Sequence, residues 1–379
     1  MSLKLKNLPA ILCTLFFLVS LPLHLNAQQA DSTSRGFLPL GGFDSDGGFG
    51  AGLMFQQVVY NGVTEPYKRL IRIRGDASLV GNISFKSDYE KRQPSGKNIA
   101  VTFLGQRIAR AFFFGTGSGT AFERPLWDAG FYDYERWYGF LSIERGIPLA
   151  TEGSLVRSEF IYGIQSEFLH TTESDFNALY ELRPDGFRGG WQNQFTAALH
   201  VDYRNSVFRP SDGYRLNVKV GAVQGLLIND FSSLNFKADV SHYLSFNVIT
   251  DIVLATRFQM KQTVGKAPFF ALQNLGGPDD LRGFPFERFH DYGAAFHNIE
   301  LRTWLIKLPL WNMEWGGQLF FDGGWLYEHP GKIDFINEYH WSIGFGGIST
   351  FLTSDFLIRG DIGFSNEIWR ISVGVGYLF

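Results

Sequence analysis

The sequence has almost no cysteine and no surplus of basic residues, and these absences exclude several classes of protein. Cys13 is the only cysteine among the 379 residues, so the chain cannot form an internal disulfide or a thiolate metal site. The eight histidines show no metal-ligand spacing, and the formal net charge is −3. We therefore expect no disulfide framework, no metal, no cofactor and no nucleic-acid partner.

The motifs of common hydrolases and nucleotide-binding enzymes are also missing. The sequence contains no Gly-x-Ser-x-Gly, no His-Glu-x-x-His and no Gly-x-x-x-x-Gly-Lys. Two Arg-Gly-Asp tripeptides, at 74–76 and 359–361, fall inside predicted strands, where chance explains them better than adhesion. These observations predict that the chain is not an enzyme.

Long apolar runs are scarce, and the one that exists lies at the N-terminus. Lys4 and Lys6 precede the run LPAILCTLFFLVSLPL, and HLNAQQA follows it with a cleavage site after Ala27. The run is shorter than the roughly 20 residues that a membrane helix needs, which disfavours the alternative of an N-terminal anchor. We therefore predict a signal peptide over residues 1–27 and export of the remaining chain.

Beyond residue 27 the sequence is rich in glycine and aromatic residues, and its apolar residues recur with period two. This alternation predicts strands of about the length that a tilted strand needs to cross a bilayer, roughly 9 to 11 residues. In an exported chain the pattern favours an outer-membrane β-barrel over the alternative of a secreted all-β protein. The segments are 49–60, 69–79, 82–90, 136–147, 155–170, 214–225, 233–246, 251–262, 298–308, 318–327, 340–349, 356–364 and 369–379.

Strand parity predicts the size of the barrel. Both chain ends must lie on the periplasmic side, which requires an even number of strands. This is met if residues 98–114 form a hairpin turning near Gly105, giving eleven strands before Leu281 and five after it. We therefore predict an all-β, 16-stranded antiparallel transmembrane β-barrel over 47–379, preceded by a short periplasmic leader over 28–46. The turn LVGN (79–82) should then be periplasmic, and the longer EKRQPSGK (90–97) should lie on the opposite side.

One loop, LGGPDDLRGFPFERFHDYG at 275–293, places an arginine between predicted strands eleven and twelve. In the following strand, period two puts Asn298, Glu300 and Arg302 on one face and Ile299 and Leu301 on the other. A basic residue on the lipid face costs on the order of 2 to 4 kcal/mol near mid-bilayer, so the charged face belongs in the lumen.

Several motifs together resemble one family. The loop motif Leu281, Arg282, Gly283 and Phe284, the strand GAAFHNIELR (293–302), the segment FFDGG (320–324) and the terminal phenylalanine resemble the BamA/TamA superfamily of outer-membrane assembly and translocation barrels, the bacterial surface antigen type. The stretches at 201–216 and 112–120 are similar to further family motifs, with Asn205 in place of an acid.

The resemblance implies where the loop lies and what holds it. In the family the sixth extracellular loop folds into the lumen, and its arginine contacts acidic groups on the inner wall. Carried onto this sequence, Arg282 should lie near Asp322, with Glu300 and Asn298 beside it. Family members usually carry POTRA domains of about 75 residues, a small domain size, and residues 28–46 are too few for one. We therefore expect a member that lacks POTRA domains.

The tail SVGVGYLF (372–379) fits the signal that the β-barrel assembly machinery reads in its clients. Its characteristic residues are Ser372, Gly374, Tyr377 and the terminal Phe379. The alternative is an ordinary last strand. The signal predicts the assembly machinery as a partner during biogenesis, and a location in the bacterial outer membrane in contact with its lipid and lipopolysaccharide.

Three functions remain open from the sequence. The first, favoured by the resemblance, is insertion or translocation of protein or another amphiphile through a lateral seam between strands one and sixteen. Candidate seam glycines, which would thin the packing there, are Gly47, Gly48, Gly50, Gly52, Gly374 and Gly376. The second is a channel gated by the inward loop. The third is a structural subunit that works with a separate periplasmic partner or as an oligomer.

Overall fold

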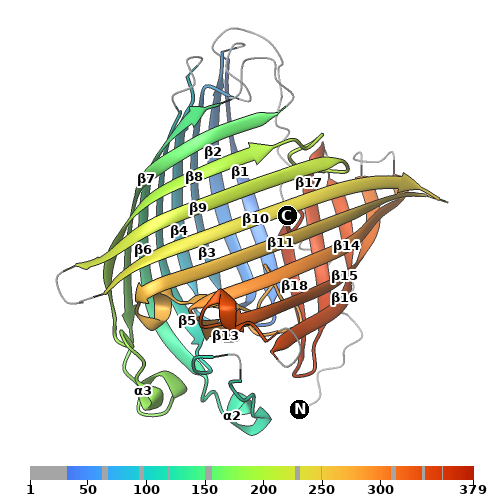
Figure 1. Ribbon diagram of the computed structural model, residues 1–379. Coiled ribbons are helices and arrows are strands. Elements are labelled where there is room, and N and C mark those ends of the chain that lie inside the picture. Colours follow the sequence, from blue (N-terminus) through green and yellow to red (C-terminus); the bar gives the residue numbers. More distant parts are fainter. Residues whose placement is uncertain are drawn as a thin grey trace.

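The computed structural model describes residues 32–379 apart from 62–66, 94–97, 118, 150–155, 227–230, 249, 309–312, 335–337 and 352. The signal peptide predicted for 1–27 lies outside the described residues. The chain forms one closed antiparallel barrel in which sixteen strands tilt around a common axis (Figure 1). The fold class predicted from the sequence is therefore confirmed.

The barrel strands follow one another in chain order around the wall, and short elements decorate the connections. The strands are β1 (Ser32–Asp44), β2 (Gly48–Tyr60), β3 (Arg69–Ser78), β4 (Ile83–Lys91), β5 (Asn98–Phe112), β6 (Asp133–Pro148), β7 (Arg157–Thr171), β8 (Gly189–Asp202), β9 (Gly213–Leu226), β10 (Ser232–Asn247), β11 (Asp251–Lys266), β14 (Gly293–Leu308), β15 (Met313–Tyr327), β16 (Tyr339–Phe351), β17 (Thr353–Phe364) and β18 (Trp369–Val375). The short elements are α2 (Arg124–Asp128), α3 (Ala178–Leu182), η2 (Phe269–Ala271), β12 (Gln273–Leu275), β13 (Phe289–Asp291) and η4 (Pro330–Lys332).

Period two separates the two faces of the wall. On β10, Leu234 and Val240 are exposed on the outer face, whereas Asp239 and Ser241 are buried on the inner one. Because successive strand residues point to opposite faces, the apolar set meets lipid and the polar set lines the lumen. Pairing between neighbouring strands satisfies most of the backbone groups that lipid could not, and the pairing is shortest where β1 meets β18.

The first strand begins earlier than the sequence predicted. Residues 32–44 form β1, which pairs along its whole length with β2 from Ser32↔Tyr60 to Asp44↔Gly48. The predicted leader over 28–46 and a barrel start at Gly47 were therefore wrong for these residues. Pro39 obscures the strand in the sequence, because proline lacks the N–H that a central strand needs and is confined to edges.

Residues 98–112 form one strand rather than a hairpin. Gly105 lies mid-strand in β5 and pairs with Phe85 on one side and Gly139 on the other, so the predicted turn there was wrong. The missed β1 and the false hairpin cancel in the strand count, so the total of sixteen is right. The connections between these two positions, however, were assigned to the wrong end of the barrel. The turn at 79–82 lies at the same barrel end as the 267–292 loop, whereas β4 ends and β5 begins at the opposite barrel end, where β1 begins.

An aromatic cluster closes one end of the barrel. The β5–β6 connection carrying α2, the β7–β8 connection carrying α3, and η2 lie together at the lower end in Figure 1. Their buried side chains pack as one core, which includes Phe112, Phe113, Trp127, Leu179 and Phe269. This cap supports the loop between β11 and β14, which enters the lumen from the same end.

Candidate functional site

The loop between β11 and β14, residues 267–292, is folded and packed inside the barrel. Its two short strands, β12 and β13, pair with each other from Gln273↔Asp291 to Leu275↔Phe289. Leu281 and Phe284 at the tip are buried with Leu275, Phe289 and residues of β14 and β15. The loop therefore brings its own small apolar core, which orients the arginine between Leu281 and Phe284.

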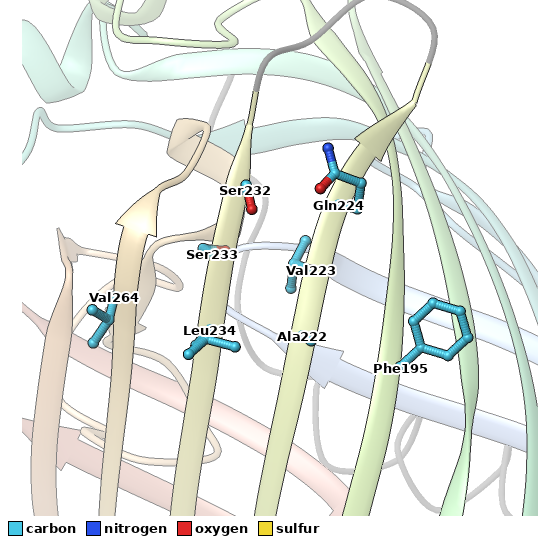
Figure 2. Close-up of a pocket in the computed structure, with 8 residues that line it drawn as sticks. All are labelled: Phe195, Ala222, Val223, Gln224, Ser232, Ser233, Leu234 and Val264. Atoms are coloured by element: carbon cyan, nitrogen blue, oxygen red, sulfur yellow. The ribbon is translucent and has the colours of Figure 1, made fainter.

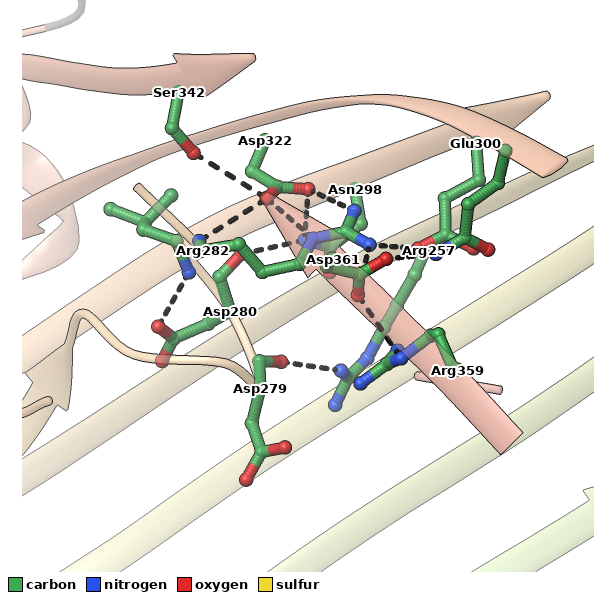
Figure 3. Close-up of polar contacts among 12 residues, drawn as sticks. Arg257, Asp279, Asp280, Arg282, Asn298, Glu300, Asp322, Ser342, Arg359 and Asp361 are labelled. Atoms are coloured by element: carbon green, nitrogen blue, oxygen red, sulfur yellow. Dashed lines mark hydrogen bonds and ion pairs between the residues drawn. The ribbon is translucent and has the colours of Figure 1, made fainter. Parts of the chain in front are cut away.

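Arg282 forms ion pairs with two acids on neighbouring strands (Figure 3). Its Nε and Nη2 donate to the two carboxylate oxygens of Asp322 at 2.9 and 2.7 Å, and Nη1 donates to Glu300 Oε1 at 2.5 Å. The guanidinium carbon also lies 3.5 Å from the ring centroid of Phe320. The structure thus brings together Arg282, Asp322 and Glu300, the set that the motif and strand periodicity place near one another.

Asn298 joins the same network and ties it to the loop backbone. Its amide nitrogen donates to Asp322 Oδ1 at 2.8 Å and to the carbonyl of Asp280 at 2.7 Å. The backbone N–H of Arg282 donates to Asp322 Oδ2 at 3.3 Å. The site therefore holds both the side chain and the main chain of the loop tip.

A third acid, Asp361 on β17, was not predicted from the sequence. Its carboxylate lies 3.6 Å from Arg282 Nη1 and 3.1 Å from Arg359 Nε. Arg359 and Asp361 belong to the Arg-Gly-Asp tripeptide at 359–361, which the sequence analysis assigned to chance. Period two places Arg359 and Asp361 on one face of the strand, and that signal could have identified them as lumenal.

The electrostatics of the site favour a permanently charged arginine. Burial opposes the charge, but the adjacent Asp322 and Glu300 carboxylates more than offset it and raise the pKa of Arg282. Removing this buried cation leaves the Asp322 carboxylate without its ionic partner, and breaking a buried pair in this way typically costs about 3 to 5 kcal/mol. The loop tip is therefore held by an interaction that fails if either partner is lost.

Gly283 allows the loop backbone to touch the wall. A Cβ at Gly283 would lie 2.7 Å from the carbonyl carbon of Phe364, and a Cβ at Gly363 on β17 would lie 2.7 Å from the carbonyl carbon of Arg282. Two glycines facing each other thus permit backbone-on-backbone contact. The motif needs glycine after the arginine for this close approach.

Two further arginine–glutamate pairs fix the loop to β6 and to the β17–β18 turn. Arg136 Nη1 donates to Glu287 at 2.9 Å, and Arg288 Nε donates to Glu367 at 2.7 Å. The Arg288 guanidinium carbon also lies 4.5 Å from the Phe289 ring centroid. The sequence analysis missed both pairs, because the partners are far apart in the chain and no local motif joins them.

The candidate seam glycines do not face one another. Gly47 lies in the β1–β2 turn, and Gly48, Gly50 and Gly52 lie on β2, so none of the four belongs to the strand beside β18. The strand pairs between β1 and β18 are Phe43↔Val373 and Asp44↔Ser372, and Ser45, just past β1, bonds to Ile371. The predicted first-strand side of the seam was therefore wrong, because β1 had been missed.

The last four residues leave the wall and enter the lumen. Strand β18 ends at Val375, after Gly374, and Gly376 adopts a φ of +84°, which favours glycine. The guanidinium carbon of Arg302 lies 3.9 Å from the Tyr377 ring centroid and 5.0 Å from that of Phe379. Phe379 packs on Tyr243 and Ala255 of the opposite strands. The predicted strand over 369–379 was wrong from Gly376 onward.

Other kinds of site are sparse in the part of the chain that the structure describes. No helix there is long and apolar enough to cross a membrane. No group of three or more histidine, cysteine, aspartate or glutamate residues is arranged there to hold a metal. A shallow pocket lies over β8 to β11 where Phe195, Leu234 and Val264 are exposed (Figure 2). That pocket is on the outer wall and is separate from the lumenal site.

The closed barrel and its inward, arginine-anchored loop define the class of protein, a β-barrel whose lumen is occupied by its own loop. The Omp85 superfamily domain model matches residues 129–377, and the chain belongs to that superfamily. A comparison with curated protein sequences finds no match.

Solved structures with the same fold include BamA and CdiB barrels. BamA from Haemophilus ducreyi lacking POTRA domains 1–3 matches with a TM-score of 0.60 and 14% identity, over 94% of this chain and 74% of that chain. CdiB from Acinetobacter baumannii matches with a TM-score of 0.59 and 10% identity, over 91% and 60%. CdiB from Escherichia coli matches with a TM-score of 0.57 and 13% identity, over 92% and 63%. This chain spans less than two thirds of either CdiB chain, and identities this low establish the fold alone.

Proposed function

We propose that this barrel lies in the bacterial outer membrane and assists insertion or translocation of polypeptide, or of another amphiphile, through an opening between β1 and β18. Membership of the Omp85 superfamily supports a general role in assembly or translocation. The observation that carries the lateral route is the two-residue junction between the first and last strands.

Among the described residues, most of the seam edge of β1 has no strand partner. β1 pairs with β2 from Ser32 to Asp44, but with β18 only at Phe43 and Asp44. Ser45 N–H donates to Ile371 O, so odd-numbered residues of β1 direct their N–H groups toward β18, and Pro39 removes one donor from that edge. Unpaired backbone groups are costly in lipid, so this edge is suited to receive a strand from another chain.

The inward tail leaves the middle of the β1 edge without a partner from β18. Residues 376–379 turn toward Arg302 instead of extending β18, where the register of the junction would place them opposite residues 37–40 of β1. At the loop end the junction is held by Asp46, whose carboxylate pairs with Arg370 of β18 and accepts from Phe286 N–H at 3.0 Å. A small set of contacts beside the inward loop therefore determines whether the seam closes.

Locking the seam tests this proposal. Cysteines replacing Phe43 and Val373 are paired across the junction, and the strand spacing suits a disulfide. Oxidation should abolish rescue of a deletion strain and leave conductance in planar bilayers unchanged, and reduction should restore rescue. A second pair at Phe55 and Ile73, partners across β2 and β3 on the same outer face, is the matched control. Oxidising the control pair should have no effect.

Two outcomes would redirect the interpretation. A locked seam that still rescues the deletion strain would remove the lateral route and favour a structural subunit with a separate periplasmic partner. Loss of rescue in both locked pairs would show that the barrel requires general flexibility rather than opening at β1 and β18.

A further inference from the structure

Three lysines lie side by side on the inner wall. Lys237 on β10 is the direct partner of Lys219 on β9 and of Lys261 on β11, and we call these three residues the lysine row. Val220 and Phe236, next to Lys219 and Lys237, and Phe258, three residues before Lys261, are exposed on the lipid face, so alternation directs the row into the lumen. Three ammonium groups therefore project from adjacent strands, whose backbones are about 4.8 Å apart.

Like charges placed directly opposite one another destabilise a sheet, and here only the ends of the row are compensated. Lys219 Nζ lies 3.7 Å from a Glu144 oxygen, and Lys261 Nζ donates to the carbonyl of Asn274 in the inward loop at 2.7 Å. Lys237 is exposed to the lumen and has no hydrogen bond or ion pair within the described residues. The lysine at the centre of the row is thus the one of the three without a contacting acceptor among the described residues.

The nearest acid on the same wall is already engaged. Asp239, two residues along β10, accepts from Arg257 at 2.9 Å and Arg215 at 3.4 Å, and Gln259 also donates to it. Arg257 in turn reaches the carbonyl of Asp279 in the loop (Figure 3). Two arginines thus share one carboxylate beside the row, and Asp239 forms no ion pair with Lys237.

We propose that the lysine row binds a multivalent oxyanion, a phosphate or carboxylate ligand with at least two negative charges. A lysine ammonium is a compact point charge with three donors, so it accepts either oxyanion without the planar geometry that arginine imposes. Strands β9 to β11 lie across the barrel from the β1–β18 junction, so the ligand reaches the row through the lumen. The site does not depend on whether the seam opens.

Calorimetric titration of the purified barrel, in neutral detergent at low salt, tests the site with pyrophosphate and citrate as probes. The parent should bind one or both saturably, and Lys237→Gln should weaken binding on the order of tenfold or more, as expected for a charge-assisted contact. Lys237→Arg should retain binding, which separates lost charge from a folding defect. Lys86→Gln is the matched control, because Lys86 is a lumenal lysine on β4 that already pairs with Asp88 at 3.4 Å.

Three results would overturn the proposal: no saturable binding by the parent, equal affinity in Lys237→Gln, or an equal loss in Lys86→Gln. Repeating the titration in nanodiscs identifies the source of the ligand. Pyrophosphate binding that is equal in zwitterionic and anionic nanodiscs supports a soluble oxyanion at the row. Binding lost only in anionic nanodiscs and restored by dilution of the anionic lipid supports the same row occupied by a lipid phosphate.

Discussion

At the scale of single residues, the loop tip depends on one buried cation and its acids. Arg282→Ala removes the ion pairs to Asp322 and Glu300; Glu300 keeps its pair with Arg302, whereas Asp322 loses its cation. The loss of docking free energy should be about 3 to 5 kcal/mol. The barrel should remain heat-modifiable on gels, while external protease should cleave residues 275–293 faster. Arg282→Lys should give intermediate protection, because it keeps the charge but loses the two-pronged contact with Asp322. Equal cleavage of parent and Arg282→Ala would contradict this role.

Gly363 makes a second prediction at the residue scale. A Cβ there would lie 2.7 Å from the carbonyl carbon of Arg282, and backbone cannot move aside as a flexible side chain can. Gly363→Ala should therefore displace the tip and raise protease cleavage although every charge is kept. Gly360→Ala on the same strand is the control, since its Cβ would meet only Val373 at 3.8 Å. Similar cleavage in the two variants would refute a steric role.

At the scale of the element, the loop should loosen as the pH falls. Burial lowers the pKa of His290 on β13 to about 4, whereas a free histidine titrates near 6.5. The folded loop therefore holds His290 neutral while the released loop takes up a proton, so docking weakens as the pH falls from about 6.5 toward 4. Limited proteolysis across this window should show rising cleavage of the loop at pH values where the barrel stays folded.

His290→Gln isolates that effect. Burial raises the pKa of Asp280 in the same loop, and a raised carboxyl pKa acts in the opposite direction, because the docked loop then binds the proton more tightly. The difference between parent and His290→Gln removes the Asp280 contribution, which both share. If the two pH profiles coincide, His290 does not control docking.

At the scale of the whole molecule, the loop is the main obstruction in the lumen. Sixteen-stranded barrels are wide enough for an aqueous channel, and here the inward loop and the aromatic cap occupy one end. Deleting residues 278–290 should produce a large, steady conductance in planar bilayers that the parent lacks. Arg282→Ala should give only brief openings, because Arg136–Glu287 and Arg288–Glu367 still hold the loop. An unchanged conductance after the deletion would mean that other segments block the pore.

The sequence by itself determined the all-β barrel, its lipid and lumenal faces and the neighbourhood of Arg282, because these follow from period two and a short motif. Only the tertiary structure decided where the chain departs from the structure that its local sequence pattern predicts. Pro39 is tolerated in β1 because the edge toward β18 is largely unpaired, and Gly105 stays extended because β4 and β6 flank it. Tyr377 and Phe379 enter the lumen because Arg302, Tyr243 and Ala255 receive them there. Each of these depends on a partner far away in the chain, which a local pattern does not encode.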